Sequence, residues 1–132
     1  MPQQDVELIL MRQLASYLTT PIFLYGPDER LLFFNEAAEK LLGLPFDEAD
    51  DMPPDQLAIL FRTKTEAGKR MPAKDLPIVI ALRERQPAHN AVRIRGIDGV
   101  WRTIEATCLP LMGQGGRSLG AVAFFWEKGQ TA

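Results

Sequence analysis

Residues 119–126 (LGAVAFFW) constrain the fold more than any other stretch, because they are apolar at both alternating sets of positions. Successive side chains of a β-strand point to opposite faces of its sheet. A strand that is apolar on both faces is normally covered on both. We therefore predict a sheet that has a layer of helices on one side and a separate cover on the other.

The chain has 132 residues, which suits one domain around one core. Hydrophobic residues make up 46% and charged residues 24%, as in globular rather than disordered proteins. The formal net charge of -2 gives no overall positive field toward nucleic acid or an anionic membrane. No apolar run approaches the ~20 residues of a membrane span, and the start does not resemble a signal peptide. We therefore expect a cytoplasmic protein that binds neither nucleic acid nor membrane.

An amphipathic helix is predicted over residues 5–18, because apolar side chains recur there at helical spacing. The helix should end at 19–21 (TTP), since β-branched residues before a proline favour extended backbone. Its apolar stripe would cover the outer face of the sheet or pack against the same helix of a second chain, so we expect a homodimer. The residues expected at this dimer or partner interface are Val6, Ile9, Leu10, Leu14 and Tyr17.

Two short apolar strands, residues 22–25 and 31–34, should form a hairpin across the turn GPDER. Asn35 is well placed to cap the following helix. Gly43 should end that helix. The next stretch is interrupted by a proline pair, so we expect short helical pieces and then a polar loop. A further helix should begin at a cap on Asp75.

From residue 90 onward the period changes to two, which predicts three strands joined as a meander. The first strand should end at the turn signal Asp98-Gly99. Ile104, Ala106 and Cys108 would share one face of the second strand. The predicted order along the chain is one helix, two strands, several short helices and three strands.

These motifs, in this order, resemble a PAS domain. The hairpin at 22–34, the Asn35 cap and the AAEKLLG helix after it resemble the opening of that family. The DLP sequence at 75–77 resembles the start of its lid helix, and DG at 98–99 and GAV at 120–122 resemble its closing strands. Each motif alone is weak, whereas their order together is specific.

The resemblance covers roughly residues 18–127. It implies an α+β fold with a five-stranded antiparallel sheet, helices on one face that enclose a small cavity, and an N-terminal amphipathic flanking helix. We assign 1–20 to the flanking helix, 21–127 to the PAS-like sensory domain and 128–132 to a tail. The implied function is a sensory module that binds a small ligand or a signalling partner protein. Some relatives hold no ligand and serve as dimerisation or docking domains, so that alternative stays open.

Residues that would hold a coloured cofactor are missing or displaced. Flavin photochemistry in relatives uses an asparagine-cysteine-arginine motif on a central helix, whereas the only cysteine, Cys108, falls on a late strand, where packing explains it. Haem-binding relatives use a histidine on the lid helix, whereas His89 falls after that helix in a predicted loop. The acidic run at 47–51 is typical of a solvated loop. We therefore expect no haem, no flavin, no metal site and no catalytic residues.

A cavity in this fold would be lined by apolar side chains from the hairpin, the lid helix and the late strands. The same residues would equally form a solid core without a ligand. The rival class is a small α+β enzyme, which would place an acid or base of perturbed pKa in an open pocket. The predicted lining residues are Phe23, Phe34, Leu42, Leu60, Val79, Leu82, Val92, Ile94, Ile104, Ala106 and Phe124.

Overall fold

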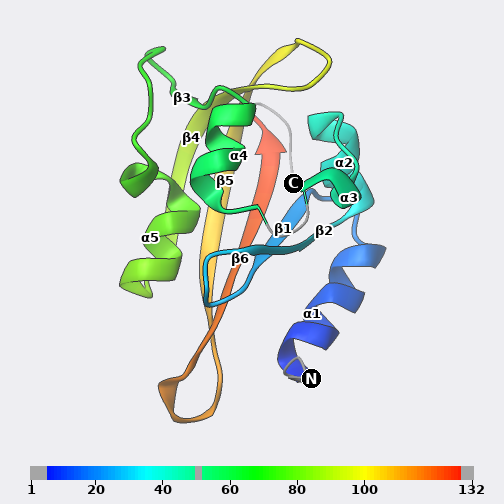
Figure 1. Ribbon diagram of the computed structural model, residues 1–132, viewed down its shortest axis with the longest axis vertical. Coiled ribbons are helices and arrows are strands. Elements are labelled where there is room, and N and C mark those ends of the chain that lie inside the picture. The colour runs from blue at the N-terminus through cyan, green and yellow to red at the C-terminus, as the bar shows by residue number, and fades with distance from the viewer. Residues whose placement is uncertain (1–5, 50–51, 129–132) are drawn as a thin grey trace.

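A computed structural model of the chain describes residues 6–49 and 52–128 (Figure 1). Within these ranges no helix combines the length and the apolar character that a membrane span needs. The helices and strands are α1 (Val6–Tyr17), β1 (Ile22–Tyr25), β2 (Leu31–Phe34), α2 (Glu36–Leu42), α3 (Phe46–Ala49), α4 (Pro54–Leu60), β3 (Lys64–Thr65), α5 (Pro77–Glu84), β4 (Ala88–Arg95), β5 (Trp101–Met112) and β6 (Ser118–Glu127), with 3-10 turns at Ala73–Asp75 and Gln114–Gly116.

The strands form one antiparallel sheet in the order β2-β1-β6-β5-β4-β3. Its five long strands are those predicted from the sequence, and the α+β architecture is confirmed. The sheet has six strands rather than five. The additional strand is the two-residue β3, which lies in the segment that we predicted to be a polar loop and pairs with β4. Such a short strand forms only because it pairs with a neighbouring strand, since its own polar sequence carries no strand pattern.

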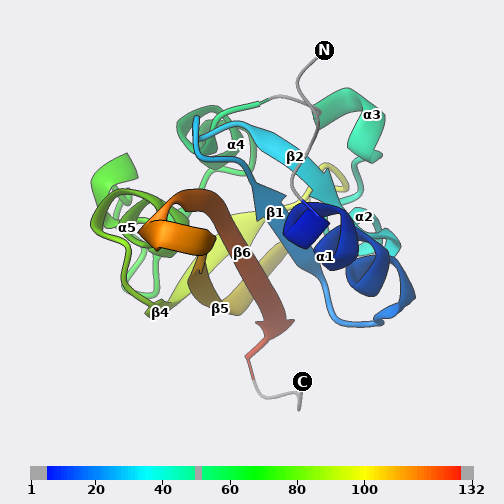
Figure 2. The same ribbon diagram turned by 90° about the horizontal axis from the view of Figure 1, so that it is seen from below.

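Both faces of the sheet are covered, as the apolar strand 119–126 required (Figures 1 and 2). The inner face carries α2, α4 and α5, and its residues include Phe23, Tyr25, Ile104, Cys108 and Ala123. The outer face carries α1, and its buried residues are Ile22, Leu24, Leu119 and Val122, packed against Leu8 and Ala15. The central strand β6 therefore contributes to two separate hydrophobic clusters.

The caps of α2 agree with the prediction. Asn35 is in extended conformation, and its side chain accepts a hydrogen bond from the backbone N–H of Ala38 at 3.1 Å. Gly43 ends the helix in the left-handed region with a φ of 71°. The sequence signals at the two ends therefore set the length of this helix.

The predicted cap of α5 is wrong. Asp75 ends the preceding 3-10 turn, and Leu76 occupies the cap position instead. The first helical residue, Pro77, has no backbone N–H to be capped, and it forces extended backbone on the residue before it. A proline at the first position therefore starts this helix without an acidic side chain.

Candidate functional site

A cavity of about 90 Å³ lies between the inner face of the sheet and the helices that cover it. Its lining is almost entirely apolar, as expected for a ligand pocket or an imperfectly filled core. The sheet contributes Phe23, Tyr25, Val92, Ile94, Ile104, Ala106, Cys108 and Phe125. The helices and their connections contribute Leu41, Leu42, Pro54, Leu57, Ala58, Phe61, Thr63, Leu76, Pro77 and Ile78.

Six of the predicted lining residues meet in the wall of this cavity. Five of them lie on the inward side of strands, and Leu42 lies at the end of α2. Period-two alternation in the strands and helical spacing in α2 predicted these positions. Their contact with a ligand stays a prediction. These six are Phe23, Leu42, Val92, Ile94, Ile104 and Ala106.

Three predicted residues lie in the inner core but not in the cavity wall. The ring of Phe34 stacks on that of Phe23, with 4.9 Å between centroids, and fills the core beside the cavity. Val79 and Leu82 on α5 pack into the same core. On this helix Ile78 faces the cavity instead, because each step along a helix turns the side chain by about 100°.

The prediction is also wrong for Leu60 and Phe124. Leu60 is 40% exposed, because α4 turns Leu57 and Phe61 toward the cavity. Phe124 packs with the outer cluster under α1. Its neighbour Phe125 lines the cavity, since adjacent strand residues point to opposite faces. The sequence offers two adjacent phenylalanines and no signal that says which one points inward.

Tyr25 and Cys108 are lining residues that the sequence analysis missed, although a signal existed. Tyr25 is two residues from Phe23, and Cys108 is two residues from Ala106, so strand alternation places each pair on one face. Applying the same parity rule to every strand would have found both. The helix residues Leu57 and Phe61 carried no comparable signal.

The titratable groups in the cavity wall stay neutral. Burial raises the pKa of the Cys108 thiol to about 12. Burial and, to a smaller degree, the nearby Cys108 raise the pKa of the Tyr25 hydroxyl far above its usual range. Neither group can exchange a proton easily near neutral pH, which general acid–base catalysis requires. The cavity is therefore suited to an uncharged ligand rather than to acid–base chemistry.

A second, more polar pocket of about 430 Å³ adjoins the cavity. Leu41 and Phe125 line both spaces, so these two side chains form the partition between them. The residues that line this outer pocket also include Lys40, Arg102 and Glu127.

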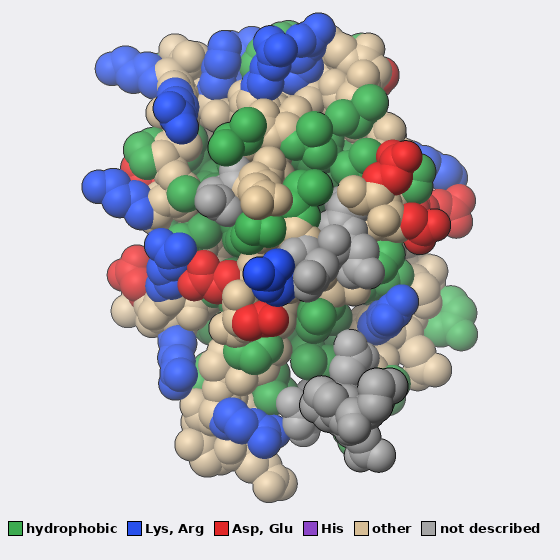
Figure 3. Space-filling view, viewed as in Figure 1, with side chains coloured by type: hydrophobic (Ala, Val, Ile, Leu, Met, Phe, Trp, Pro, Cys, Tyr) green, Lys and Arg blue, Asp and Glu red, His purple; other side chains and the backbone are tan. Residues whose placement is uncertain are grey.

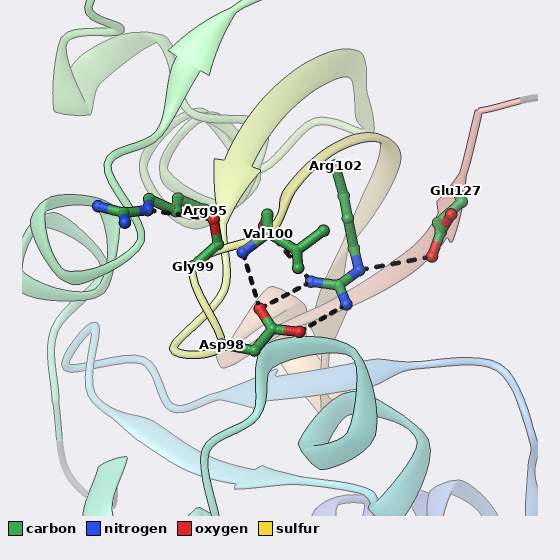
Figure 4. A network of polar contacts seen from close by, with 6 residues as sticks. All are labelled: Arg95, Asp98, Gly99, Val100, Arg102 and Glu127. Atoms are coloured by element: carbon green, nitrogen blue, oxygen red, sulfur yellow. Dashed lines mark hydrogen bonds and ion pairs between the residues drawn. The ribbon is translucent and has the colours of Figure 1, made fainter.

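Arg102 in the outer pocket belongs to a polar network at the turn between β4 and β5 (Figure 4). Its Nη2 lies 2.9 Å from Oδ2 of Asp98, and its Nε lies 3.7 Å from Oε1 of Glu127. The hydrogen bond from Arg102, followed by one from the backbone N–H of Val100, lowers the pKa of Asp98. The network therefore fixes one wall of the outer pocket through charge.

Asn35 does more than cap α2, because it also holds the end of α1. Its Nδ2 donates hydrogen bonds to the backbone carbonyls of Ala15 and Thr20, both at 2.9 Å, and to that of Leu18 at 3.4 Å. Its Oδ1 also accepts from the backbone N–H of Ile22 at 3.1 Å. With 1% exposure, it is a fully satisfied buried amide that joins α1, β1 and α2.

The apolar stripe predicted on α1 faces away from the sheet. Leu8 and Ala15 provide the buried contacts with the outer face, and Met11 packs beside them. The expectation that the predicted stripe covers its own sheet is therefore wrong. The helix α1 is apolar on two sides, and the side that carries Leu8 and Ala15 packs against the sheet. The five stripe residues are all exposed in this chain: Val6, Ile9, Leu10, Leu14 and Tyr17.

His89 lies on strand β4 rather than in a loop. Its Nδ1 is 2.7 Å from the hydroxyl of Thr107, and its Nε2 is 3.5 Å from Oε1 of Glu105. It is absent from the cavity lining. Residues 50–51 of the acidic run lie outside the described residues, and within the described ranges no three histidine, cysteine or acidic side chains group as metal ligands would.

Lys and Arg side chains gather at the end of the molecule that carries β3 (Figure 3). Two of them contact an indole here: the Lys64 ammonium lies 4.7 Å and the Arg93 guanidinium 5.5 Å from the ring centroid of Trp101. Cation–π contacts of this length are attractive. These two cations therefore have a structural role in holding the tryptophan against the edge of the sheet.

Comparisons with known proteins bear on the fold. No family model matches the sequence, and no curated protein matches it. Among solved structures, the chain is similar to the PAS domain of a protein from Colwellia psychrerythraea, with 17% identity, a TM-score of 0.67, and coverage of 92% of this chain and 96% of that one.

Two further structures are similar over nearly the whole chain. A PAS domain from a two-component sensor histidine kinase shares 17% identity, with a TM-score of 0.56 and coverage of 96% of this chain and 100% of that one. The PAS domain of the fruit-fly ELK potassium channel shares 10% identity, with a TM-score of 0.75 and coverage of 96% and 100%. The architecture, the order of the sequence motifs and these structural matches agree: this chain has the PAS fold.

Proposed function

We propose that this chain is a non-enzymatic sensory module, which binds a small apolar ligand in the cavity and passes the signal to α1. One observation carries the proposal: the short helix α2 touches both places. Leu41 and Leu42 at its end line the cavity, and Asn35, which caps its start, donates hydrogen bonds to the carbonyl of Ala15 near the end of α1 and to that of Thr20 just after it. These two contact regions lie at opposite ends of α2, which has seven residues. A ligand that displaces the end of α2 would therefore strain the joint with α1.

Two further observations support this proposal. The two titratable groups of the cavity are held neutral by burial, which fits ligand binding better than acid–base catalysis. One solved structure with this fold is a PAS domain from a sensor histidine kinase, although likeness of fold alone leaves function open. We place the module in the cytoplasm, where a single buried, free Cys108 suits a reducing environment.

Xenon binding followed by methyl NMR tests the cavity. We expect xenon to shift the methyl signals of Leu42 and Ile104, because xenon enters dry apolar cavities. Ala106→Met should abolish the shifts by filling the space, whereas Ala91→Met, on the same sheet outside the cavity lining, should preserve them. Unshifted methyls in the wild type, or equal shifts in Ala106→Met, would contradict ligand binding here. Native mass spectrometry with an absorption spectrum should show no haem or flavin in the purified protein.

We further propose that the outward stripe of α1 forms a homodimer with the same helix of a second chain. Five large apolar side chains of one short helix are exposed, including Tyr17 at 82%. Burying such area stabilises association by about 25 cal/mol per Å², which can offset the entropy lost when two chains join. The dimer would also place the joint at Asn35 next to the subunit interface.

Sedimentation of an Ile9→Glu, Leu14→Glu variant tests the dimer. We expect a dimeric wild type and a folded, monomeric variant, since the two charges would be buried at the interface. Ile59→Glu is the matched control, because Ile59 is 69% exposed on α4, remote in sequence from α1. A folded double variant with the subunit number of the wild type would overturn the proposal.

A ligand-free dimerisation or docking domain is the second candidate function. It is favoured by the exposed stripe of α1, which needs no cavity to act, and by the small volume of the cavity. The two experiments separate the candidates. A dimer that depends on the stripe, combined with no response to xenon, would support docking over ligand sensing.

A further inference from the structure

Tyr25 is one of the few polar residues in a mostly apolar cavity wall, and it is 2% exposed. It lies on β1, two residues after Phe23, so its ring shares the inner face. Among the described residues, none forms a hydrogen bond with its hydroxyl. A hydroxyl that is removed from water without a partner costs free energy, so native structures rarely keep one.

The position of this hydroxyl follows from a second observation. Within the described part of the chain, no fully enclosed side-chain oxygen or nitrogen lacks a hydrogen-bond partner. The unpartnered oxygen of Tyr25 is therefore not fully enclosed by protein atoms. Because Tyr25 is buried and lines the cavity, we infer that the open space beside its hydroxyl is the cavity.

We propose that Tyr25 is the polar anchor of the cavity and donates a hydrogen bond to a small uncharged ligand, which carries one acceptor on an apolar body. This inference rests on the proposed ligand-binding function and specifies the chemistry of the ligand. Short ketones, aldehydes and esters belong to this class. The other polar lining residues, Thr63 and Cys108, offer a hydroxyl and a weakly bonding thiol.

The size of the cavity restricts the ligand further. Its volume of about 90 Å³ is smaller than the ~150 Å³ of an apolar cavity that accepts benzene. The ligand, or the part of it that enters, therefore has about four or five non-hydrogen atoms, fewer than the six of benzene. A larger molecule would need the partition formed by Leu41 and Phe125 to open toward the outer pocket.

The charge of the lining excludes carboxylates. None of the described lining residues is a lysine, an arginine or a histidine. An ionised carboxylate in this site would lose its hydration and gain one neutral hydrogen bond in exchange, which is unfavourable. The tyrosine stays a neutral donor throughout the physiological range, because burial raises its pKa. The site should therefore select against charge at any pH near neutrality.

Three probes of similar small size test the inference by NMR titration. Xenon is purely apolar, butanone adds one neutral acceptor, and propionate adds a charge. Tyr25→Phe removes only the hydroxyl, and Thr103→Val is the control, because it removes a hydroxyl on β5 outside the cavity lining. We expect Tyr25→Phe to weaken butanone binding about 3- to 10-fold, the effect of one hydrogen bond, and to leave xenon binding unchanged. Thr103→Val should change neither affinity, and propionate should not bind.

The outcomes distinguish this inference from the function on which it rests. Xenon binding with equal butanone affinity in wild type and Tyr25→Phe would leave ligand sensing intact and overturn the role of Tyr25. Propionate binding as tight as that of butanone would also overturn it. Failure of both xenon and butanone to bind the wild type would remove the proposed function itself.

A measurement on the wild type alone covers the case in which the variant does not fold. With ¹³C-labelled tyrosine, butanone should shift the signal of the ring carbon that bears the Tyr25 hydroxyl much more than xenon does. Equal shifts of the Tyr25 signal with both probes would contradict a hydrogen bond.

Discussion

The two faces of the sheet are packed in different ways. The inner face is covered by several short helices and keeps a cavity that Tyr25 helps to line. The outer face is covered by α1 alone, through a small cluster that includes Leu8, Ala15 and Val122. The inner face thus has space for a guest molecule, whereas the outer face holds one helix firmly in place.

This difference separates the proposed binding of a ligand from the proposed output. A ligand can enter or leave the cavity on the inner face without a change in strand pairing. The outer cluster and Asn35 hold α1 to the sheet, and α1 still exposes its second apolar side. Variants that affect one face, the other, or the strands shared by both should therefore have effects of different size.

The largest effect is expected on the inner face. Ile104→Asp should unfold the domain, because an unpaired buried carboxylate costs about 4 kcal/mol or more against a typical total of about 5–15 kcal/mol. Ile104 is buried and lines the cavity. Circular dichroism should show lost secondary structure, and a natively folded variant would contradict the assigned face.

Glu105→Ala is the matched change on the opposite face of the same strand. The carboxylate of Glu105 accepts a hydrogen bond from Nε1 of Trp126 at 2.9 Å, so its loss should cost about 1 kcal/mol. Urea unfolding measures the difference. Equal destabilisation by the changes at positions 104 and 105 would show that the two faces are wrongly assigned.

The next largest effect is expected where both faces share their strands. Gly120 has a φ of 119°, and a side chain there would place its Cβ 1.8 Å from the backbone oxygen of Tyr25. Gly120→Ala should therefore separate β1 from β6 locally and cost about 3 kcal/mol or more. Thermal unfolding measures this loss, and retained stability would contradict the close approach of the two strands.

Gly115→Ala is the control for backbone conformation without contact. Gly115 also has a positive φ, of 70°, but a Cβ at this turn would meet no atom within 4 Å. Its substitution should cost only about 1 kcal/mol, the price of a left-handed conformation for an L-residue. A loss at position 115 as large as that at position 120 would attribute both effects to conformation rather than to strand contact.

A smaller effect is expected from the joint between α1 and the domain. Asn35→Ala removes the cap of α2 and leaves the carbonyls of Ala15 and Thr20 without this donor. We expect a loss of about 2–3 kcal/mol, together with faster hydrogen exchange in α1 than in β5. Uniform acceleration across the chain would argue against Asn35 as a local anchor.

Asn90→Ala is the matched control for the asparagine change. Asn90 is exposed on β4. Among the described interactions, its side chain makes one hydrogen bond, which it accepts from the backbone N–H of Ala91. Its removal should change stability by about 0.5 kcal/mol or less. A similar loss at positions 35 and 90 would show that burial of the Asn35 network contributes little.

The smallest effect concerns acid stability at the rim of the outer pocket. The hydrogen bond from Arg102 and the N–H of Val100 lower the pKa of Asp98 in the folded state. Because of this lowered pKa, ionised Asp98 stabilises the fold at pH values above the unfolded-state pKa of about 3.9. This stabilisation is lost as the pH falls through the pKa of the folded state. Wild type should therefore be slightly more stable than Asp98→Asn at neutral pH, and the gap should close in acid. A gap that is independent of pH would contradict an ionic contribution.

Much of the candidate site was predictable from local sequence rules. Strand alternation placed Val92, Ile94, Ile104 and Ala106 together, because a strand with one polar side has an unambiguous inward side. The same rule failed at Phe124, where both sides of the strand are apolar. Periodicity can tell that such a strand is covered twice, but it cannot assign each residue to a face.

The sequence by itself determined the order of elements, the hairpin, the cap at Asn35 and the double cover of β6, because these depend on interactions between near neighbours or on composition along one element. Only the tertiary structure decided which side of α1 meets the sheet, that Asn35 donates to the carbonyl of Ala15 near the end of this helix, and that Tyr25 lines a cavity. These features depend on how separate elements rotate and approach one another, and a helix that is apolar on two sides leaves its own rotation undetermined.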